Sequence, residues 1–225
     1  MNGAELATAI TVALRAESDP DRAPGQQAYM KSSLPFFGVP VPRARRIATA
    51  AARGIRDPET LRDAAIRLWD GAEAREQWYA ALALLAVRPH RGDQSILPLI
   101  EKFVRGAQWW DITDELAHRV AELLDAHPVA VAALVRRWMT DEDLWVRRLA
   151  ILSQLGRKER VDRALLTETI EANVHDRDFF IRKAIGWALR EVARADPDGV
   201  RRFLSEHPDL SALSVREASK HLGTL

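Results

Sequence analysis

The chain has 225 residues, of which 47% are hydrophobic and 29% are charged, and its 33 basic and 32 acidic side chains leave a formal net charge of +1. This composition is that of about one folded domain, and it excludes a disordered, collagenous or low-complexity chain. The absence of cysteine also excludes disulfides, thiolate metal sites and a cysteine nucleophile. A net charge near zero neither favours nor opposes a nucleic-acid partner, so any basic footprint must come from the arrangement of the surface.

The sequence shows no segment typical of a membrane protein or a secreted protein. No apolar run approaches the ~18 residues that a membrane span needs. The first residues carry Glu5 ahead of their apolar stretch, whereas a secretory signal would begin with a basic region. We therefore expect a cytoplasmic protein with no membrane partner.

Apolar residues recur at three- and four-residue spacing, and no stretch alternates with period two for long enough to make a strand. This pattern predicts an all-α protein. Proline stands at the expected first turn of three helices, at Pro58, Pro128 and Pro197, where its missing N–H costs nothing. The expected helices cover residues 4–17, 24–33, 42–54, 58–69, 74–88, 94–106, 110–126, 128–139, 142–156, 160–174, 178–195, 197–206 and 214–222.

A repeat narrows the architecture. The pattern Asp-x-x-(Val/Ile)-Arg-(Arg/Lys) begins at Asp143 and again at Asp178, and Asp111 opens a further helix 32 residues before Asp143. Each aspartate can cap a helix, and the β-branched residue three positions on begins the buried stripe. The pattern resembles a HEAT repeat, although its period is shorter than the usual ~40–47 residues. We therefore predict a curved solenoid of HEAT-like antiparallel helix pairs that forms a single domain over residues 1–225.

The helix expected at 110–126 places a carboxylate away from the core. Asp114 follows the apolar Ile112 by two residues, which is about 200° around the helix axis, and Trp110 lies one turn before Asp114 on the same face. One interpretation is a packed tryptophan beside a solvated carboxylate near a helix start. The other is a functional pair on an exposed face.

The helices expected at 142–156 and 178–195 carry two further candidates. Trp187 lies about 200° from Ile185 and shares its face with basic side chains, which suits either a phosphate backbone or a tryptophan that anchors one helix to another. Arg148 flanks a buried stripe. It is either a structural arginine between repeats or a fixed fork for a phosphate.

Other types of site find little support. Three arginines follow Pro42, at the start of the helix expected at 42–54, and they are either a phosphate contact or a solvated cluster. The six histidines show no ligand spacing, so we expect no metal site. The sequence also lacks a glycine-rich phosphate loop and a G-x-S-x-G nucleophile turn.

Five segments carry a resemblance to a known family: Gln27 to Arg43, Trp109 to Asp114, Trp145 to Leu152, Phe179 to Arg190 and Leu213 to His221. The specific motifs among them are Trp-Trp-Asp-x-x-Asp, which begins at Trp109, and Lys-Ala-Ile-Gly-Trp, which ends at Trp187. In order and over about residues 25–222, the chain closely resembles the AlkD family of bacterial DNA alkylation-repair glycosylases.

The resemblance implies an all-helical protein that binds duplex DNA and hydrolyses the N-glycosidic bond of purines alkylated at N3 or N7, leaving an abasic site. It implies that Asp114 is the catalytic carboxylate, that Trp110 and Trp187 are aromatic walls, and that Arg148 is a supporting cation near the DNA backbone. The family contains inactive relatives that lack this set, whereas all four positions are filled here. The implied DNA-binding residues are Tyr29, Arg43, Trp109, Arg182, Lys183, Arg190 and Lys220.

The chemistry of the lesion agrees with these residues. A purine alkylated at N3 or N7 is cationic and already a good leaving group, so it needs no general acid. An ionised Asp114 can stabilise the positive charge that develops on the sugar and can orient or deprotonate a water. We therefore expect a cofactor-free, metal-free monomer that acts on duplex DNA at the nucleoid.

Two other functions remain open. The chain could be a HEAT-repeat module that binds DNA or protein without catalysis, and such a module would release no base. It could also be an enzyme dedicated to bulky adducts, for instance for self-protection in a producer of alkylating compounds.

Overall fold

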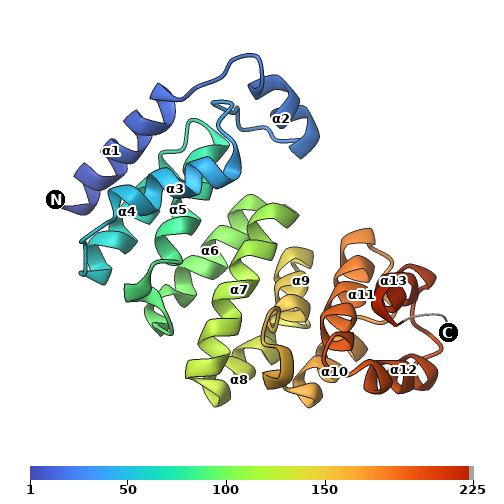
Figure 1. The fold of residues 1–225 in the computed structure, drawn as a ribbon. Helices are drawn as coiled ribbons and strands as arrows, with labels where there is room; N and C mark the ends of the chain where they lie inside the picture. The colour runs from blue at the N-terminus through green and yellow to red at the C-terminus, as the bar shows by residue number, and fades with distance from the viewer. Residues whose placement is uncertain (223–225) are drawn as a thin grey trace. The chain divides into compact units, whose positions relative to one another are not determined.

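The computed structural model describes residues 1–222, and in this part of the chain it contains helices and no strand (Figure 1). The all-α fold class is therefore confirmed. No helix within these residues is both long and apolar enough to cross a membrane. The α-helices are α1 (Gly3–Ala16), α2 (Ala23–Met30), α3 (Val41–Ala51), α4 (Pro58–Asp70), α5 (Arg75–Leu85), α6 (Leu97–Ala107), α7 (Trp110–Ala126), α8 (Pro128–Trp138), α9 (Leu144–Leu152), α10 (Arg163–Glu171), α11 (Phe179–Ala193), α12 (Pro197–Glu206) and α13 (Ala212–Ala218).

The helices gather into two compact units, one formed by residues 1–99 and the other beginning at Ile100, within the first turn of α6. The expectation of a single domain over residues 1–225 stays a prediction. In the first unit, α1 packs on α3 and α4, and α5 packs on α3 and α4. The core of this unit is built from fully buried leucine and isoleucine side chains, including Leu6 and Ile10 of α1 and Leu61 of α4.

A buried carboxylate organises the loop between α2 and α3. Glu76 of α5 accepts hydrogen bonds from the backbone N–H groups of Phe37, Gly38 and Val39, at 2.9–3.0 Å. Gly38 has a φ of +93°, and a Cβ there would lie 2.0 Å from the carbonyl oxygen of Asp19. Only glycine fits this conformation and this close approach.

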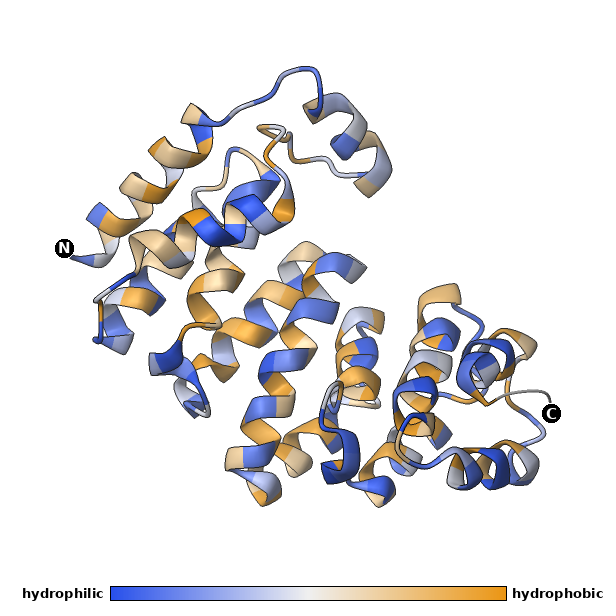
Figure 2. Cartoon of the chain, in the orientation of Figure 1, coloured by the Kyte–Doolittle hydropathy of each residue, from blue (hydrophilic) through white to orange (hydrophobic). Residues whose placement is uncertain are grey.

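In the second unit the helices stack in consecutive pairs. Helices α7, α9, α11 and α13 pack side by side in that order, while α8, α10 and α12 pack along one side of this row, the lower side in Figure 1. Each of these helices carries both apolar and polar residues (Figure 2). The apolar residues form the buried stripes. The buried stripes of α7 and α11 consist of Ile112, Leu116, Val120, Leu123, Leu124, Ile181, Ala184, Ile185, Ala188, Leu189 and Val192.

Several expected helices differ from the observed ones by a few residues at an end, and proline explains two of these differences. The helix expected at 74–88 ends at Leu85 and is followed by a separate 3-10 turn at Arg88–His90. The ring of Pro89 would clash with the carbonyl group of Leu85, four residues earlier. The helix expected at 94–106 begins as a 3-10 turn at Gln94–Ile96, and α6 proper starts at Leu97. Pro98 has no N–H to donate to the carbonyl group of Gln94.

The capping pattern is confirmed at two of the three aspartates. Asp143 Oδ1 accepts a hydrogen bond from the backbone N–H of Trp145 at 2.8 Å, and Asp178 Oδ1 accepts one from that of Phe180 at 2.7 Å. The expectation for Asp111 is wrong, because α7 starts earlier. Its N-cap residue is Trp109, which makes no side-chain cap, and Asp111 lies inside the first turn.

Candidate active site

The candidate site is built on three neighbouring helices of the second unit, α7, α9 and α11. The apolar stripe of α7 is buried. The side chain of Asp114 lies on the opposite side of the helix, as its spacing from Ile112 predicts. Its side chain is not fully solvated, because only 15% of it is exposed. A carboxylate held in this way needs a partner for its charge.

Arg148 of α9 is that partner. Its Nε donates to Asp114 Oδ1 and its Nη2 donates to Asp114 Oδ2, both at 2.8 Å, while Nη1 donates to the backbone carbonyl oxygen of Phe180 at 2.6 Å. The side chain of Arg148 is only 4% exposed. One guanidinium thus joins all three helices and fixes the carboxylate in a two-pronged, charge-assisted pair.

This geometry bears on the two interpretations of Arg148 from sequence. The arginine bridges adjacent helix pairs, as a structural arginine of a repeat would. Because its guanidinium faces Asp114 and is almost fully buried, it is not an open fork for a phosphate in this conformation.

Trp109, Trp145 and Phe180 form an aromatic cluster, and the Phe180 ring of this cluster lies against the Arg148 guanidinium. The ring centroids of Trp109, Trp145 and Phe180 lie 4.9–5.8 Å apart in tilted arrangements, and Arg148 Cζ lies 5.9 Å from the centre of the Phe180 ring. Such contacts stabilise a cation and restrict its movement. Trp109, expected to contact DNA, packs on Trp145 and Phe180 and is half-buried, and its contact with DNA stays a prediction.

Burial and Arg148 act on the pKa of Asp114 in opposite directions. Burial raises this pKa and has the largest effect, because it penalises the charged carboxylate, while the hydrogen bonds and positive charge of Arg148 lower it. The pKa of Asp114 ends above its ordinary value of 3.8. A carboxyl group that is both desolvated and oriented is typical of a functional site, although structural pairs also show it.

The two expected aromatic walls lie on the same helices as the pair. Trp110 is the first residue of α7, one turn before Asp114, and Trp187 lies on α11 about two turns after Phe180. Both side chains are half-buried. Each tryptophan therefore keeps part of its surface accessible, in contrast to the core tryptophan Trp138.

The expected basic face of α11 is partly neutralised. Arg190 and Lys220 share one carboxylate, that of Glu217, at 2.6 and 2.7 Å. Arg182 donates to the carbonyl oxygen of Asp176 at 3.0 Å. Lys183 lies over the ring of Phe179. The positive electrostatic potential at this face is therefore weaker than the number of basic residues in the sequence suggests.

Two expected DNA-binding residues belong to the first unit. Tyr29 on α2 is 74% exposed. Arg43 on α3 donates from Nε to Glu17 Oε2 at 2.6 Å, and this pairing raises the pKa of Arg43. Tyr29 is therefore accessible, whereas the charge of Arg43 is already balanced.

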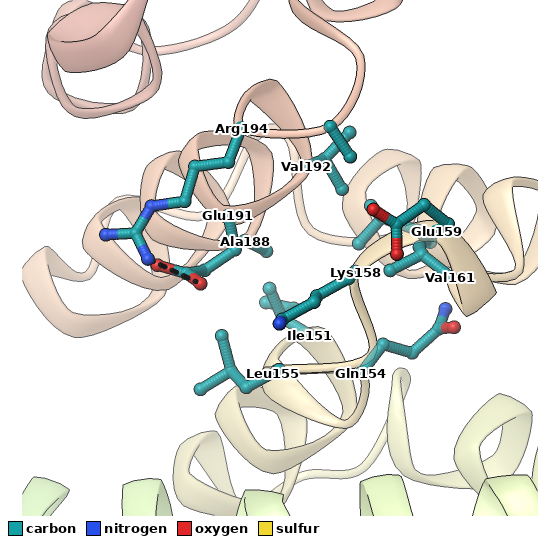
Figure 3. Close-up of a pocket in the computed structure, with 13 residues that line it drawn as sticks. Ile151, Gln154, Leu155, Lys158, Glu159, Val161, Ala188, Glu191, Val192 and Arg194 are labelled. Atoms are coloured by element: carbon teal, nitrogen blue, oxygen red, sulfur yellow. Dashed lines mark ion pairs between the residues drawn. The ribbon is translucent and has the colours of Figure 1, made fainter.

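A cavity of about 300 Å³ lies near the C-terminal ends of α9 and α11 (Figure 3). Its floor is apolar, with Ile151 and Val192, and its rim carries Lys158, Glu159 and the Glu191–Arg194 ion pair. None of the expected site residues lines it. No cluster within residues 1–222 has the three or more acidic or histidine ligands that would hold a metal ion.

Sequence reasoning missed two contributors to the site. The backbone carbonyl group of Phe180 holds Arg148, and no side-chain pattern reports a backbone acceptor. Trp145 of α9 is buried, and its ring packs on those of Trp109 and Phe180, the second of which contacts Arg148.

Comparison with known proteins adds the following. The sequence model of the family described as "DNA alkylation repair enzyme" matches residues 10–222. A solved structure titled "Predicted DNA alkylation repair enzyme from Enterococcus faecalis" is similar with a TM-score of 0.81 and 27% sequence identity, over 92% of this chain and 98% of that one. No curated protein matches in sequence.

Two structures from Streptococcus mutans share the fold. One, AlkD2, has a TM-score of 0.64 at 19% identity, over 83% of this chain and 92% of that one. The other, smu.31, has a TM-score of 0.62 at 19% identity, over 81% and 92%.

Proposed function

Since this chain belongs to the family of DNA alkylation repair enzymes, we propose that it is a DNA glycosylase for cationic alkylpurines. Its substrates are purines alkylated at N3 or N7 in duplex DNA, of the 3-methyladenine and 7-methylguanine type. The reaction hydrolyses the N-glycosidic bond and leaves an abasic site. The proposed active form is a monomer, and the chemistry requires neither a metal nor a cofactor.

The observation that carries the proposal is the Asp114–Arg148 pair. The two-pronged geometry at 2.8 Å is that of an ionised carboxylate. The carboxylate is held by three helices, keeps 15% of its surface exposed, and has Trp110 one turn away. An oriented anion of this kind can stabilise a positive charge that appears close to it.

The substrate supplies the driving force for bond cleavage. As the glycosidic bond breaks, its electron pair moves to the purine nitrogen and neutralises the cationic base, while positive charge appears on the deoxyribose. Asp114 stabilises this charge and orients a water, which adds at C1′ and gives up a proton to Asp114 or to solvent. No acid is needed to protonate the leaving base.

Trp110 and Trp187 serve as aromatic walls in this proposal. Indole faces attract cations, with about 0.5–2 kcal/mol each depending on desolvation, and both the alkylated base and the developing sugar cation carry positive charge. The enzyme then selects the alkylated purine by its positive charge and by its labile N-glycosidic bond. An undamaged purine is neutral and its N-glycosidic bond is stable.

The proposed partner is duplex DNA. Lys183 and Arg182 on α11, with Arg190 and Lys220 beside them, are the proposed phosphate contacts in the second unit, and Tyr29 and Arg43 those in the first. Binding at Arg190 and Lys220 requires their shared partner, Glu217, to release part of its hold.

Base release from methylated duplex DNA tests the proposal. We expect the wild-type protein to release 7-methylguanine and 3-methyladenine, measured as free bases by mass spectrometry under single-turnover conditions. Asp114→Asn should abolish release, because the neutral amide stabilises no sugar cation, while duplex binding in fluorescence anisotropy stays largely intact.

Asp114→Asn also leaves the buried Arg148 charge without its partner, which can cost up to about 3–5 kcal/mol of stability. The matched control is Asp125→Asn, since Asp125 lies on the same helix as Asp114, pairs with the buried Arg157 at 3.0 Å and lies outside the proposed site. Thermal unfolding shows how much each variant is destabilised. Release by Asp114→Asn at the wild-type rate, or equal loss of release in both variants, would contradict a catalytic Asp114.

One observation favours a second function, a binding module without catalysis. The Asp114–Arg148 pair is a sound structural bridge between neighbouring helices, and a scaffold would use it in the same way. Such a protein would bind duplex DNA or another protein and release no base in the same assay.

A further inference from the structure

Phe179 is an exposed aromatic residue at the edge of the candidate active site. It is the first residue of α11 and is 52% exposed. The next residue, Phe180, supplies the carbonyl oxygen that holds Arg148, and the two phenyl rings meet edge to face with centroids 5.4 Å apart. Phe179 is thus the solvent-facing end of the aromatic cluster formed by Trp109, Trp145 and Phe180. Single exposed apolar residues are common on protein surfaces, so exposure alone assigns no role.

A cation lies on this ring. The Nζ atom of Lys183 is 5.5 Å from the centre of the Phe179 ring, which is within the range of a cation–π contact. Among the charged neighbours on α11, Arg190 is bound to a carboxylate and Arg182 to a carbonyl group. Lys183, by contrast, is exposed and its ammonium group rests on an aromatic face. Its charge helps to lower the pKa of the nearby Glu217 carboxyl, and the ammonium group can still reach an anion.

The helical register puts Lys183 between two aromatic residues. Phe179, Lys183 and Trp187 follow one another at intervals of four residues. Each step advances about 6 Å along α11, and the three lie within an arc of about 80°. Along one side of the helix the order is therefore aromatic, cationic, aromatic.

This order matches the chemistry of one DNA strand, in which each anionic phosphate lies between two deoxyriboses with apolar C–H surfaces. We propose that Phe179 and Lys183 extend the active site along the strand that carries the lesion. Trp187 faces the deoxyribose of the lesion, Lys183 binds the adjacent phosphate, and Phe179 packs on the next deoxyribose. The inference rests on the proposed function for the position of Trp187, and it adds Phe179 as a substrate contact.

The two side chains should affect binding in different ways. The Phe179 contact is apolar, so its loss weakens binding without changing the dependence on salt. The Lys183 contact displaces counterions from DNA, and each such phosphate contact adds about 0.9 to the slope of log K against log salt. Both contacts act on binding, so the loss should appear in the affinity for duplex DNA and in base release at limiting enzyme.

The experiment compares Phe179→Ala and Lys183→Met with two controls in the same unit. Val129→Ala removes an 84% exposed apolar side chain from α8, and Lys158→Met removes an exposed lysine from the loop after α9. The probe is a fluorescein-labelled duplex with a tetrahydrofuran abasic-site analogue, titrated by anisotropy at several salt concentrations. Base release from methylated duplex is measured in parallel, and thermal unfolding checks each fold.

We expect Phe179→Ala to weaken binding by about threefold to tenfold at an unchanged salt slope, and Phe179→Leu to restore part of the loss. Lys183→Met should reduce the slope by about one unit, and both controls should bind like the wild type. Equal binding by Phe179→Ala and Val129→Ala would overturn the proposal. A lower saturating rate of Phe179→Ala at unchanged affinity would also overturn it, because Phe179 would then act on Arg148 through Phe180.

This design separates the inference from the proposed glycosylase. If the wild-type protein releases no base but Phe179→Ala and Lys183→Met weaken duplex binding as described, the glycosylase assignment fails and the DNA contact stands. If the wild-type protein releases base and both variants bind normally, the contact fails and the glycosylase assignment stands.

Discussion

Burial and a single guanidinium together set the charge state and the orientation of the candidate catalytic residue, Asp114. Asp114 is desolvated enough for burial to raise its pKa, and the two hydrogen bonds from Arg148 oppose this rise. The residue gains orientation from this balance but is easier to protonate than a surface aspartate. Arg148 in turn is held by the carbonyl group of Phe180 and lies against the ring of the same residue.

This balance predicts the acid limb of the pH–rate profile. Only the ionised carboxylate stabilises a sugar cation, so base release should fall as the pH drops through the raised pKa of Asp114, above the ordinary 3.8. Arg148→Met removes the group that lowers this pKa, so the limb should move to higher pH. Single-turnover release against pH, corrected for spontaneous depurination, measures both profiles.

The control for this shift is Arg147→Met, which breaks the neighbouring pair with Asp176 and should leave the limb in place. An acid limb that stays fixed or moves to lower pH in Arg148→Met would show that Asp114 is not the titrating group.

At the scale of a helix, the N-terminus of α11 serves two purposes. Asp178 caps it by accepting a hydrogen bond from the backbone N–H of Phe180 at 2.7 Å, and the backbone carbonyl oxygen of Phe180 accepts one from Arg148. The cap therefore fixes the first turn on which the site depends. Further along the helix, a Cβ on Gly186 would lie 2.6 Å from the carbonyl oxygen of Ser214, so glycine lets α13 approach α11 closely.

We predict that Asp178→Ala lowers both stability and activity. Loss of an N-cap costs about 1 kcal/mol, read as a lower midpoint of thermal unfolding. Base release at saturating enzyme should also fall, because a frayed first turn no longer holds the Phe180 carbonyl group. The matched variant is Asp162→Ala, which removes the equivalent cap of α10. It should lose similar stability and keep full activity, and equal activity losses in the two variants would exclude a specific role for the α11 cap.

At the scale of the whole molecule, charge is nearly balanced, with 33 basic and 32 acidic side chains. Many of the arginines are engaged in ion pairs, so DNA binding must draw on a few cations that can reorient. Glu217 matters here, because it binds both Arg190 and Lys220. The proposed DNA surface is therefore restrained by an acidic residue of its own.

Salt titration tests this arrangement. Duplex affinity of the wild-type protein should fall linearly on a plot of log K against log salt, and Glu217→Gln should steepen the slope by up to about two units by freeing two cations. Glu168→Gln frees Arg136 on α8 and should leave the slope unchanged. A flat wild-type response in the anisotropy titration would count against phosphate contacts altogether, and equal slopes in all three proteins would exclude the restraint by Glu217.

The local pattern of the sequence was sufficient for the helices and for most of their buried faces. Helical periodicity, the caps at Asp143 and Asp178 and the prolines at first turns are properties of a few neighbouring residues, so they can be read without knowing the fold. The same periodicity placed Asp114 opposite the apolar stripe of α7. The predicted C-terminal end of α5 and the predicted start of α6 were wrong, because the effects of Pro89 and Pro98 on the backbone outweigh the apolar spacing.

The contacts that make the site were decided only in three dimensions. Asp114 and Arg148 are 34 residues apart, and their pairing depends on the lateral packing of α7 on α9, which no local pattern encodes. The hydrogen bond from Arg148 to the Phe180 carbonyl group and the binding of Glu217 to two cations also depend on the packing of separate helices. The sequence specifies which charged residues are present. Their burial and the distances between them, which the tertiary structure determines, decide which charges are paired, oriented or able to contact a substrate.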